Sequence, residues 1–242
     1  MKTPLFKRIV LKLSGEVLAG ASHRAIDGPT LENIAAQIRE VKDCGVDIAV
    51  VVGGGNIIRG ASDHLPGVNR IAGDYMGMLA TNINALALKS CFEVQKVPTV
   101  ILSAISVEGV IDSFAQDAAL SHLEEGKLVI FAGGTGHPYF TTDTAAALRA
   151  VEIGADAILK GTKVDGVYSA DPVEVPQATL YQYLSFMDVL KNDLKVMDTT
   201  AVSLCMEHNI PLIVFNAKRE GTFKRIILGE SLGTRIEGED ND

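Results

Sequence analysis

Residues 47–55 read Asp-Ile-Ala-Val-Val-Val-Gly-Gly-Gly, an apolar and largely β-branched run that passes directly into three glycines. Residues 9–15 and 128–136 have the same character. A strand that ends in glycine lets backbone N–H groups approach an anion closely, and a helix that follows adds the positive end of its dipole. Three such turns predict that several phosphate groups gather in one crevice at the carboxyl ends of parallel strands, as phosphoryl transfer requires.

Strand-like runs alternate with helical ones along most of the 242 residues, which predicts an α/β fold with a parallel sheet covered by helices. The predicted strands are residues 8–13, 46–52, 97–102, 127–132, 156–160 and 210–215. The predicted helices are residues 31–41, 74–89, 112–123, 143–153, 199–207 and 221–228. We expect one domain over residues 1–242, with a soft division near residue 150.

Three segments of this pattern carry more specific predictions. In the helix over 74–89, one face is predicted to carry the apolar side chains of Met78, Leu79, Ile83 and Leu86. Residues 163–176 include prolines and a glycine in a polar stretch and are expected to form a surface loop. Residues 237–242 are expected to form an acidic tail.

Composition narrows the possible partners. A formal net charge of -8 argues against a general nucleic-acid binder, although a small anionic ligand remains possible in a locally basic cleft. The three cysteines have no Cys-x-x-Cys spacing and are expected to be small buried side chains in a reducing compartment. No segment approaches the roughly 18 apolar residues of a membrane span, so we expect a soluble cytoplasmic protein without membrane contact.

The first glycine turn follows Lys12, a cation at the end of an interior strand. Such a charge is costly to bury unless an anion pairs with it, and a phosphate oxygen would meet that need. The alternative is that Lys12 extends from the strand end toward water. The turn is not a Walker A loop, because the order G-x-x-x-x-G-K-[ST] is absent.

The second turn places three glycines together, followed by Arg59 and Gly60. A purely structural tight turn needs one or two glycines, so the run favours close backbone contact with a ligand. The Rossmann spacing G-x-G-x-x-G fails, because Ile58 stands where the third glycine is needed. A nicotinamide-dependent enzyme is therefore disfavoured.

The third turn, residues 133–143, combines glycines, three threonines and an acid at the predicted start of a helix. Asp143 fits two roles, the N-cap of that helix or an anion that holds two lysines around a transferring phosphoryl group. We favour the second role. His137 is expected to be a loop or substrate contact rather than a general base, because a phosphate nucleophile is already anionic at neutral pH.

Taken together, these motifs resemble the bacterial UMP kinases, a family within the amino acid kinase superfamily. The resemblance continues through Leu159 to Pro172 and Leu194 to Asp198 and so covers nearly the whole chain. The segment Gly73 to Thr81 is the part that distinguishes it from acetylglutamate kinase, aspartokinase and carbamate kinase, which share similar glycine loops.

The resemblance implies a three-layer αβα sandwich with a mainly parallel sheet, and transfer of the ATP γ-phosphate to UMP in pyrimidine nucleotide (CTP) biosynthesis. Residues 1–150 would form the acceptor side and residues 151–242 the ATP side. Mg²⁺ would accompany ATP, and the sequence does not identify metal ligands in the chain, since nucleotide phosphates and water can hold the ion. The resemblance also implies a homohexamer, inhibition by UTP and activation by GTP.

The family's functional residues carry over by motif. The implied catalytic residues are Lys12, Asp143 and Lys160. The implied ATP contacts are Lys12, Leu13, Ser14, Gly15, Gly55, Arg59, Thr162, Tyr168 and Asp171. The implied UMP contacts are Gly54, Asp74, Thr135, Gly136, His137, Pro138, Tyr139, Phe140, Thr141 and Thr142.

Two segments depart from the family pattern. His137 stands where an asparagine usually follows Thr-Gly, which limits how far its contact with UMP can be carried over. Residues 22–27 lack the usual glycine and aromatic residue, which limits the inference of GTP activation. Two alternatives to a UMP kinase are another small-acid kinase of the same fold and a noncatalytic nucleotide sensor or storage protein, which would not need Lys12, Asp143 and Lys160 together.

Overall fold

The computed structural model describes residues 2–20, 24–58, 66–172, 174–175 and 177–238. Within these residues the strands form one nine-stranded sheet of order β4-β3-β5-β2-β1-β6-β8-β9-β7. The strands are β1 (Arg8–Leu13), β2 (Asp47–Val52), β3 (Thr99–Ser103), β4 (Asp112–Ser113), β5 (Leu128–Ala132), β6 (Ala157–Thr162), β7 (Tyr183–Ser185), β8 (Leu212–Asn216) and β9 (Thr234–Glu237).

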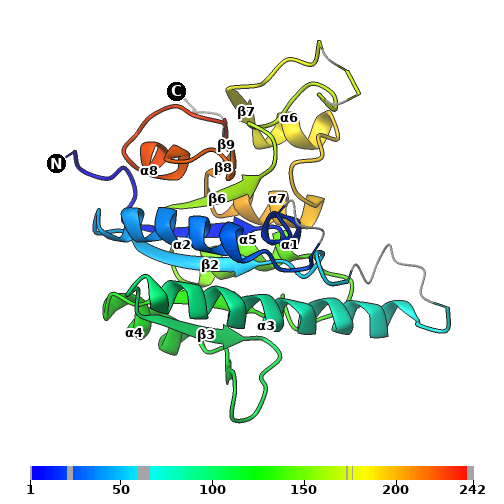
Figure 1. Cartoon of the computed structure of the whole chain (residues 1–242). Coiled ribbons are helices and arrows are strands. Elements are labelled where there is room, and N and C mark those ends of the chain that lie inside the picture. Colours follow the sequence, from blue (N-terminus) through cyan, green and yellow to red (C-terminus); the bar gives the residue numbers. More distant parts are fainter. Residues whose placement is uncertain (1, 21–23, 59–65, 173, 176, 239–242) are drawn as a thin grey trace.

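The helices lie in two layers, one on each face of the sheet (Figure 1). They are α1 (Gly15–Leu18), α2 (Gly28–Lys42), α3 (Arg70–Val94), α4 (Gln116–Glu124), α5 (Thr142–Glu152), α6 (Phe186–Lys191), α7 (Thr199–Glu207) and α8 (Thr222–Ile227). The side chains of α1, α2, α3 and α8 pack into one core, and those of α4, α5, α6 and α7 pack into the other. The predicted three-layer αβα sandwich is therefore confirmed.

The central strand β1 shows how the sequence separates the two cores. Ile9, Leu11 and Leu13 belong to the core on the α2 side, whereas Val10 belongs to the core on the α5 side. This follows from the period of two along a strand, which sends successive side chains to opposite faces. A strand buried on both faces has no polar side, which explains why the middle of β1, residues 9–11, is apolar at every position.

The sheet is mainly parallel, as predicted. β1 pairs in parallel with β2 and β6, and β5 pairs in parallel with β2 and β3. The pairing of β8 with β9 is antiparallel. The carboxyl ends of β1, β2, β5 and β6 consequently meet at one edge of the sheet, where the three glycine turns begin.

The predicted bounds hold best in the strongly patterned elements. β1 and α7 begin and end at the predicted residues, and the other predicted strands agree to within a few residues. The prediction of a helix over 112–123 is wrong at its start, because Asp112 and Ser113 pair with β3 as the edge strand β4. Ala115 is extended, and the helix begins only at Gln116.

The prediction for the buried face of α3 is also wrong. Met78 is buried, but Leu79, Ile83 and Leu86 are exposed. The buried face instead carries polar side chains, Thr81, Asn82 and Asn84, together with small and apolar ones. The large apolar side chains of this helix therefore do not mark its buried face.

The carboxyl-terminal part contains elements that the sequence did not predict, namely β7, α6 and β9. The described residues of 163–176 contain no helix and no strand beyond a single bridge at Tyr168, which confirms the predicted loop for those residues. Of the predicted acidic tail, Glu237 instead ends β9, and residues 239–242 lie outside the described part. No helix in the described part of the chain is long and apolar enough to cross a membrane.

Candidate active site

Two lysines face each other across neighbouring strands at the carboxyl edge of the sheet. Lys12 on β1 is the register partner of Lys160 on β6. Both side chains project toward the α5 face, since each lies two residues beyond a strand residue, Val10 or Ile158, that packs into that core. Lys12 is only 6% exposed, so the alternative in which it extends into water is wrong.

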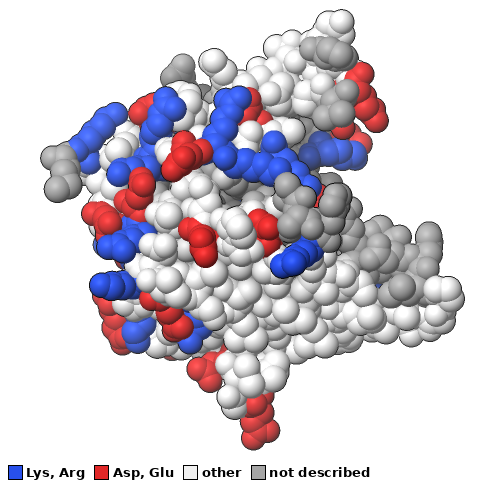
Figure 2. Space-filling view, viewed as in Figure 1, with Lys and Arg blue, Asp and Glu red and all other residues white. Residues whose placement is uncertain are grey.

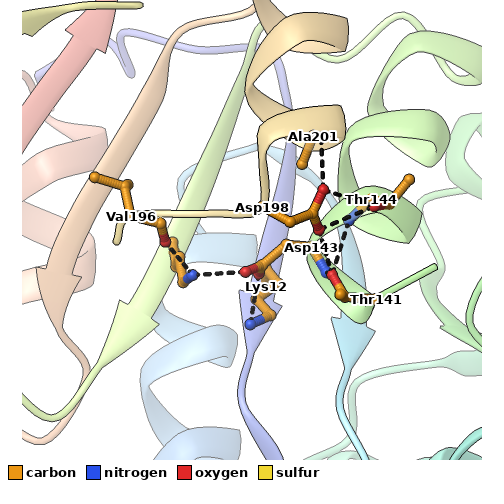
Figure 3. A network of polar contacts seen from close by, with 8 residues as sticks. Lys12, Thr141, Asp143, Thr144, Val196, Asp198 and Ala201 are labelled. Atoms are coloured by element: carbon orange, nitrogen blue, oxygen red, sulfur yellow. Dashed lines mark hydrogen bonds and ion pairs between the residues drawn. The ribbon is translucent and has the colours of Figure 1, made fainter. Parts of the chain in front are cut away.

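The carboxylate of Asp143 lies between the two ammonium groups (Figure 3). Its Oδ1 is 2.7 Å from Nζ of Lys12, and its Oδ2 is 2.9 Å from Nζ of Lys160. Lys160 also donates a short hydrogen bond to the carbonyl of Val196. The family motifs predict that these three charged residues act together, and in the structure they are in direct contact.

The charges of this cluster shift one another's protonation. Burial opposes ionisation of Asp143, but the ammonium groups of Lys12 and Lys160 outweigh it and hold the pKa of Asp143 below its ordinary 3.8. Burial, followed by the charge of Lys12, lowers the pKa of Lys160 from 10.5, although Asp143 opposes this shift. An anion that arrived beside these two lysines would relieve the cost of holding both charges in a largely dry site.

The N-cap alternative for Asp143 is wrong, because Thr141 caps α5. The Thr141 hydroxyl accepts from the backbone N–H groups of Asp143 and Thr144. Asp143 therefore lies in the first turn of α5, where the positive end of the helix dipole favours its negative charge. Its carboxylate is left to bind the lysines.

Asp198 ties the start of α5 to the start of α7. It accepts hydrogen bonds from the hydroxyls of Thr141 and Thr144, and its Oδ1 caps α7 through the N–H of Ala201 at 2.9 Å (Figure 3). The hydroxyl of Thr141, an implied UMP contact, is thus already engaged within the protein. This role of Asp198 is not among the predictions, although an aspartate directly before a predicted helix is a typical N-cap signal.

The first two glycine turns pack backbone against backbone. A Cβ at Gly15 would lie 2.8 Å from the N atom of Gly55, and one at Gly53 would lie 3.1 Å from the N atom of Gly15. A Cβ at Gly54 would lie 2.5 Å from the carbonyl oxygen of Gly77 on α3. Contacts with backbone atoms therefore require glycine at positions 15 and 54, whatever ligand these residues also meet, whereas the contact at Gly53 is tight.

The remaining implied phosphate contacts either lie beside this pair of turns or fall outside the described residues. Leu13 ends β1, and Ser14 precedes α1 without capping it through its side chain. The Ser14 hydroxyl can therefore serve a ligand at the start of the turn. Arg59 lies outside the described residues.

The implied contacts for the adenosine end line one cavity of about 610 Å³. Thr162, Tyr168 and Asp171 form part of its wall, and Lys160 joins it to the charged cluster. Residues 192–196, which follow α6, close another side. Residues 192–193 are a part of this wall that the sequence does not predict, because α6, which precedes them, has no clear pattern in the sequence.

The implied UMP loop approaches α3 through Asp74. Its Oδ2 accepts from the Tyr139 N–H at 2.9 Å, and both its oxygens accept from Nε of Arg70. Tyr139 has a positive φ of 74°, a strained conformation for a bulky residue that this contact helps to hold. Arg70 was not identified from the sequence.

The rest of that loop runs from β5 to α5. The Thr135 hydroxyl accepts from the N–H of His137 at 3.2 Å. Gly136 has a positive φ and packs beside Ala104, and Pro138, Phe140 and Thr142 complete the path to α5. Phe140 is exposed. The structure therefore brings Asp74 and residues 135–142 to one place.

The sequence matches the model of the amino acid kinase family over residues 7–216. The chain belongs to the amino acid kinase family. A uridylate kinase of Coxiella burnetii is 50% identical over 234 residues, which cover 97% of this chain and 96% of that relative.

Two solved structures of the family agree with the fold. UMP kinase from Bacillus anthracis superposes with a TM-score of 0.93 at 36% identity, over 97% of each chain. UMP kinase from Ureaplasma parvum superposes with a TM-score of 0.89 at 37% identity, over 96% of this chain and 98% of that one. These relatives confirm the family resemblance found in the motifs.

Proposed function

We propose that this chain is a UMP kinase, which transfers the γ-phosphate of ATP to UMP and forms ADP and UDP. One observation carries the proposal, the contact of Lys12 and Lys160 with Asp143. Lys160 lines the cavity on the ATP side, and Asp143 follows the acceptor loop directly. The cluster therefore lies where a donor and an acceptor phosphate would meet. The names of the relatives, at up to 50% identity over nearly the full length, support UMP as the acceptor.

Phosphoryl transfer requires mainly that the substrates are positioned and that the developing negative charge is stabilised. The phosphoryl group in transfer carries negative charge on its equatorial oxygens, and the ammonium groups of Lys12 and Lys160 would stabilise that charge. Asp143 would hold both lysines in place before the reaction. No general base is required, because the phosphate of UMP is anionic at neutral pH.

We assign the two substrates to two sides of the cluster. The ATP side comprises the cavity wall at Thr162, Tyr168 and Asp171 and the phosphate turns at Leu13 to Gly15 and Gly55, with Arg59 as a further contact. The acceptor side comprises Gly54, Asp74 and residues 135–142. Residues 151–242 thus supply most of the nucleoside site for ATP, and residues 1–150 supply the site for UMP.

We propose that Mg²⁺ enters with ATP. The described residues contain no group of three or more histidine, cysteine, aspartate or glutamate side chains placed to hold a metal ion. This fits an ion that keeps its coordination to nucleotide phosphates and water. Bound there, Mg²⁺ would neutralise charge on the β- and γ-phosphates.

We further propose that the chain forms a homohexamer, with α3 at one of its interfaces. A stripe of apolar side chains on this helix is exposed, and it comprises Ile71, Tyr75, Met76, Leu79, Ile83 and Leu86. Figure 2 shows a broad surface without charged side chains over α3. A contiguous apolar patch of this kind is typical of an interface between subunits, and a second copy of the chain supplies a matching surface.

We also propose that nucleotides regulate the enzyme and that it acts in the cytoplasm. UTP as an inhibitor and GTP as an activator are proposed from the family pattern, and each is tested by adding it to the assay at fixed ATP and UMP. Within the segment that departs from that pattern, Ser22 and His23 lie outside the described residues. The three free cysteines and the nucleotide substrates suit the cytoplasm.

The test is a substrate panel. The protein is incubated with ATP and Mg²⁺ plus UMP, CMP, acetylglutamate or aspartate, and ADP release is followed. We expect fast release with UMP and slow release with the other three compounds. An absence of ADP release with UMP contradicts the proposal, and preferential turnover of an amino acid would identify a different kinase of this fold.

A further inference from the structure

The buried face of α3 carries three polar side chains, and each binds a different loop at the carboxyl edge of the sheet. Thr81 accepts from the N–H of Gly133, and Asn82 donates to the carbonyl of Ile105. Asn84 donates to the carbonyl of Gly53 at 2.7 Å. Buried polar groups are costly unless they form hydrogen bonds, so these contacts explain why the buried face of α3 tolerates three of them.

Asn84 is the most buried of the three, with no exposed surface. Its amide also forms a reciprocal pair with Asn56 in the second glycine turn. Asn84 Nδ2 donates to Asn56 Oδ1 at 2.7 Å, and Asn56 Nδ2 donates to Asn84 Oδ1 at 3.0 Å. Both N–H donors of Asn84 are therefore directed at the turn that contains Gly54 and Gly55.

Asn56 extends this connection to two further segments. Its Nδ2 donates to the carbonyl of Ala25 at 2.6 Å. Its Oδ1 lies so close to Gly15 that a Cβ there would be 2.4 Å away. The pair of asparagines thus bonds the second glycine turn and the segment before α2 to α3, and Asn56 packs directly against the first glycine turn.

We infer that Asn84 and Asn56 are positioning residues for phosphoryl transfer, which set the spacing of the two phosphate turns without touching the reacting groups. This inference rests on the proposed function. An apolar side chain at position 84 would fill the interior without the cost of burying an amide, but it could not hold the Gly53 carbonyl. A displacement of about 1 Å between groups that orient reacting phosphates is enough to cost on the order of 100-fold in rate.

The test compares Asn84→Ala and Asn56→Ala with Leu88→Ala. Leu88 lies one turn further along α3, is equally buried, and packs into the apolar core. We expect each asparagine variant to lose at least tenfold in kcat, while KM for ATP and for UMP changes less than threefold. Leu88→Ala is expected to lower the unfolding temperature and to keep kcat within twofold at a temperature where it is folded.

The double variant provides a second measurement. Because the two amides act as one unit, Asn56→Ala in the Asn84→Ala background should lower kcat less than twofold further. Asn56 lies in a turn and is only partly buried, so its variant keeps the test usable if Asn84→Ala fails to fold.

Three results would overturn the inference. They are a kcat within twofold of the wild type in Asn56→Ala, a matching loss of kcat in Leu88→Ala, and full additivity in the double variant. A wild-type chain that does not phosphorylate UMP would overturn the proposed function as well, and this result is separate from an active wild type with unaffected variants.

Discussion

Lys12 and Lys160 occupy register-paired positions on two adjacent parallel strands, and both bind the carboxylate that begins α5. Like charges so close in a buried site repel each other. Asp143 offsets this repulsion through one oxygen for each lysine. The sheet register and the Thr141 cap of α5 thus create a site prepared for additional negative charge.

The first prediction concerns Lys12→Ala. Loss of its ammonium group should raise the barrier by about 3–4 kcal/mol, the magnitude found for single groups that stabilise transition-state charge, which corresponds to about 10²–10³ in kcat. UMP should still bind, because the proposed UMP contacts lie elsewhere. Steady-state kinetics and calorimetric titration with UMP provide the measurements.

A control for that variant is Lys127→Ala. Lys127 lies just before β5, at the opposite edge of the sheet, where its side chain pairs with Glu125. Its removal should leave kcat within twofold. Normal turnover by Lys12→Ala would refute the proposed role of Lys12, and equal losses in both variants would indicate a general effect of charge.

The second prediction concerns Asp74→Asn. We expect KM for UMP to rise about tenfold or more, because a hydrogen bond to a charged group contributes about 1.5–3 kcal/mol. KM for ATP should change less than threefold, since Asp74 belongs to the acceptor side. The carboxylate also binds Arg70 and the Tyr139 N–H, so the variant should loosen the acceptor loop.

The ratio of the two KM values decides this prediction. A change of similar size for ATP and UMP would indicate a folding defect rather than a role in acceptor binding. Arg70→Ala serves as a companion variant, because it removes the partner of Asp74 and keeps the carboxylate. It should raise KM for UMP in the same direction and by a smaller factor.

The strongly patterned parts of the fold were predictable from the sequence. β1 and α7 were placed correctly because each has a dense apolar pattern and a clear stop. Lys12 is recognisable for a similar reason, since it lies at the end of an apolar strand run, whereas the proposed catalytic role of Lys160 comes from the family motif. Asp143 was found because it ends the third glycine turn and begins a helix. Local sequence carries these signals directly.

Other features depend on tertiary contacts and left little local signal. β7 has three residues and α6 has six, which is too short for a periodic pattern to emerge. Asn84 and Asn82 look like exposed positions on a helix, and only the loops packed against α3 make them interior. The apolar residues Leu79 and Ile83 look like core residues for the complementary reason.

The third prediction is a loss of activity at alkaline pH. The pKa of Lys160 is lowered from 10.5 by burial and by the charge of Lys12, so the lysine should lose its proton, and its catalytic charge, below pH 10.5. We expect kcat/KM, which reports the free enzyme, to fall on the alkaline side with an apparent pKa that belongs to the coupled cluster. A profile of kcat/KM against pH measures this.

The pH dependence of stability distinguishes this loss of activity from unfolding, because the contribution of Lys160 to stability changes with pH in the opposite direction. Because the unfolded chain holds the Lys160 proton at higher pH than the folded chain does, the contribution of Lys160 to stability increases with pH and is complete above 10.5. Thermal unfolding measured over the same range should therefore show no loss of stability from this group where kcat/KM declines. A flat kcat/KM up to pH 10.5 would contradict the prediction.

The last prediction concerns the apolar stripe on α3. Leu79 and Ile83 are exposed on successive turns, and burial of such side chains against a second copy contributes about 25 cal/mol for each Å² of apolar surface removed from water. A glutamate in this stripe would be buried without a partner in the assembly, at a cost that exceeds the gain from the remaining contacts. We therefore expect the double variant Leu79→Glu with Ile83→Glu to reduce the molar mass measured by light scattering after size-exclusion chromatography.

Leu5→Glu is the control, since Leu5 is an exposed leucine outside α3, and the molar mass of this variant should equal that of the wild type. An unchanged mass for the α3 variant would remove this helix from the subunit interface, and a monomeric wild type would remove the homohexamer itself.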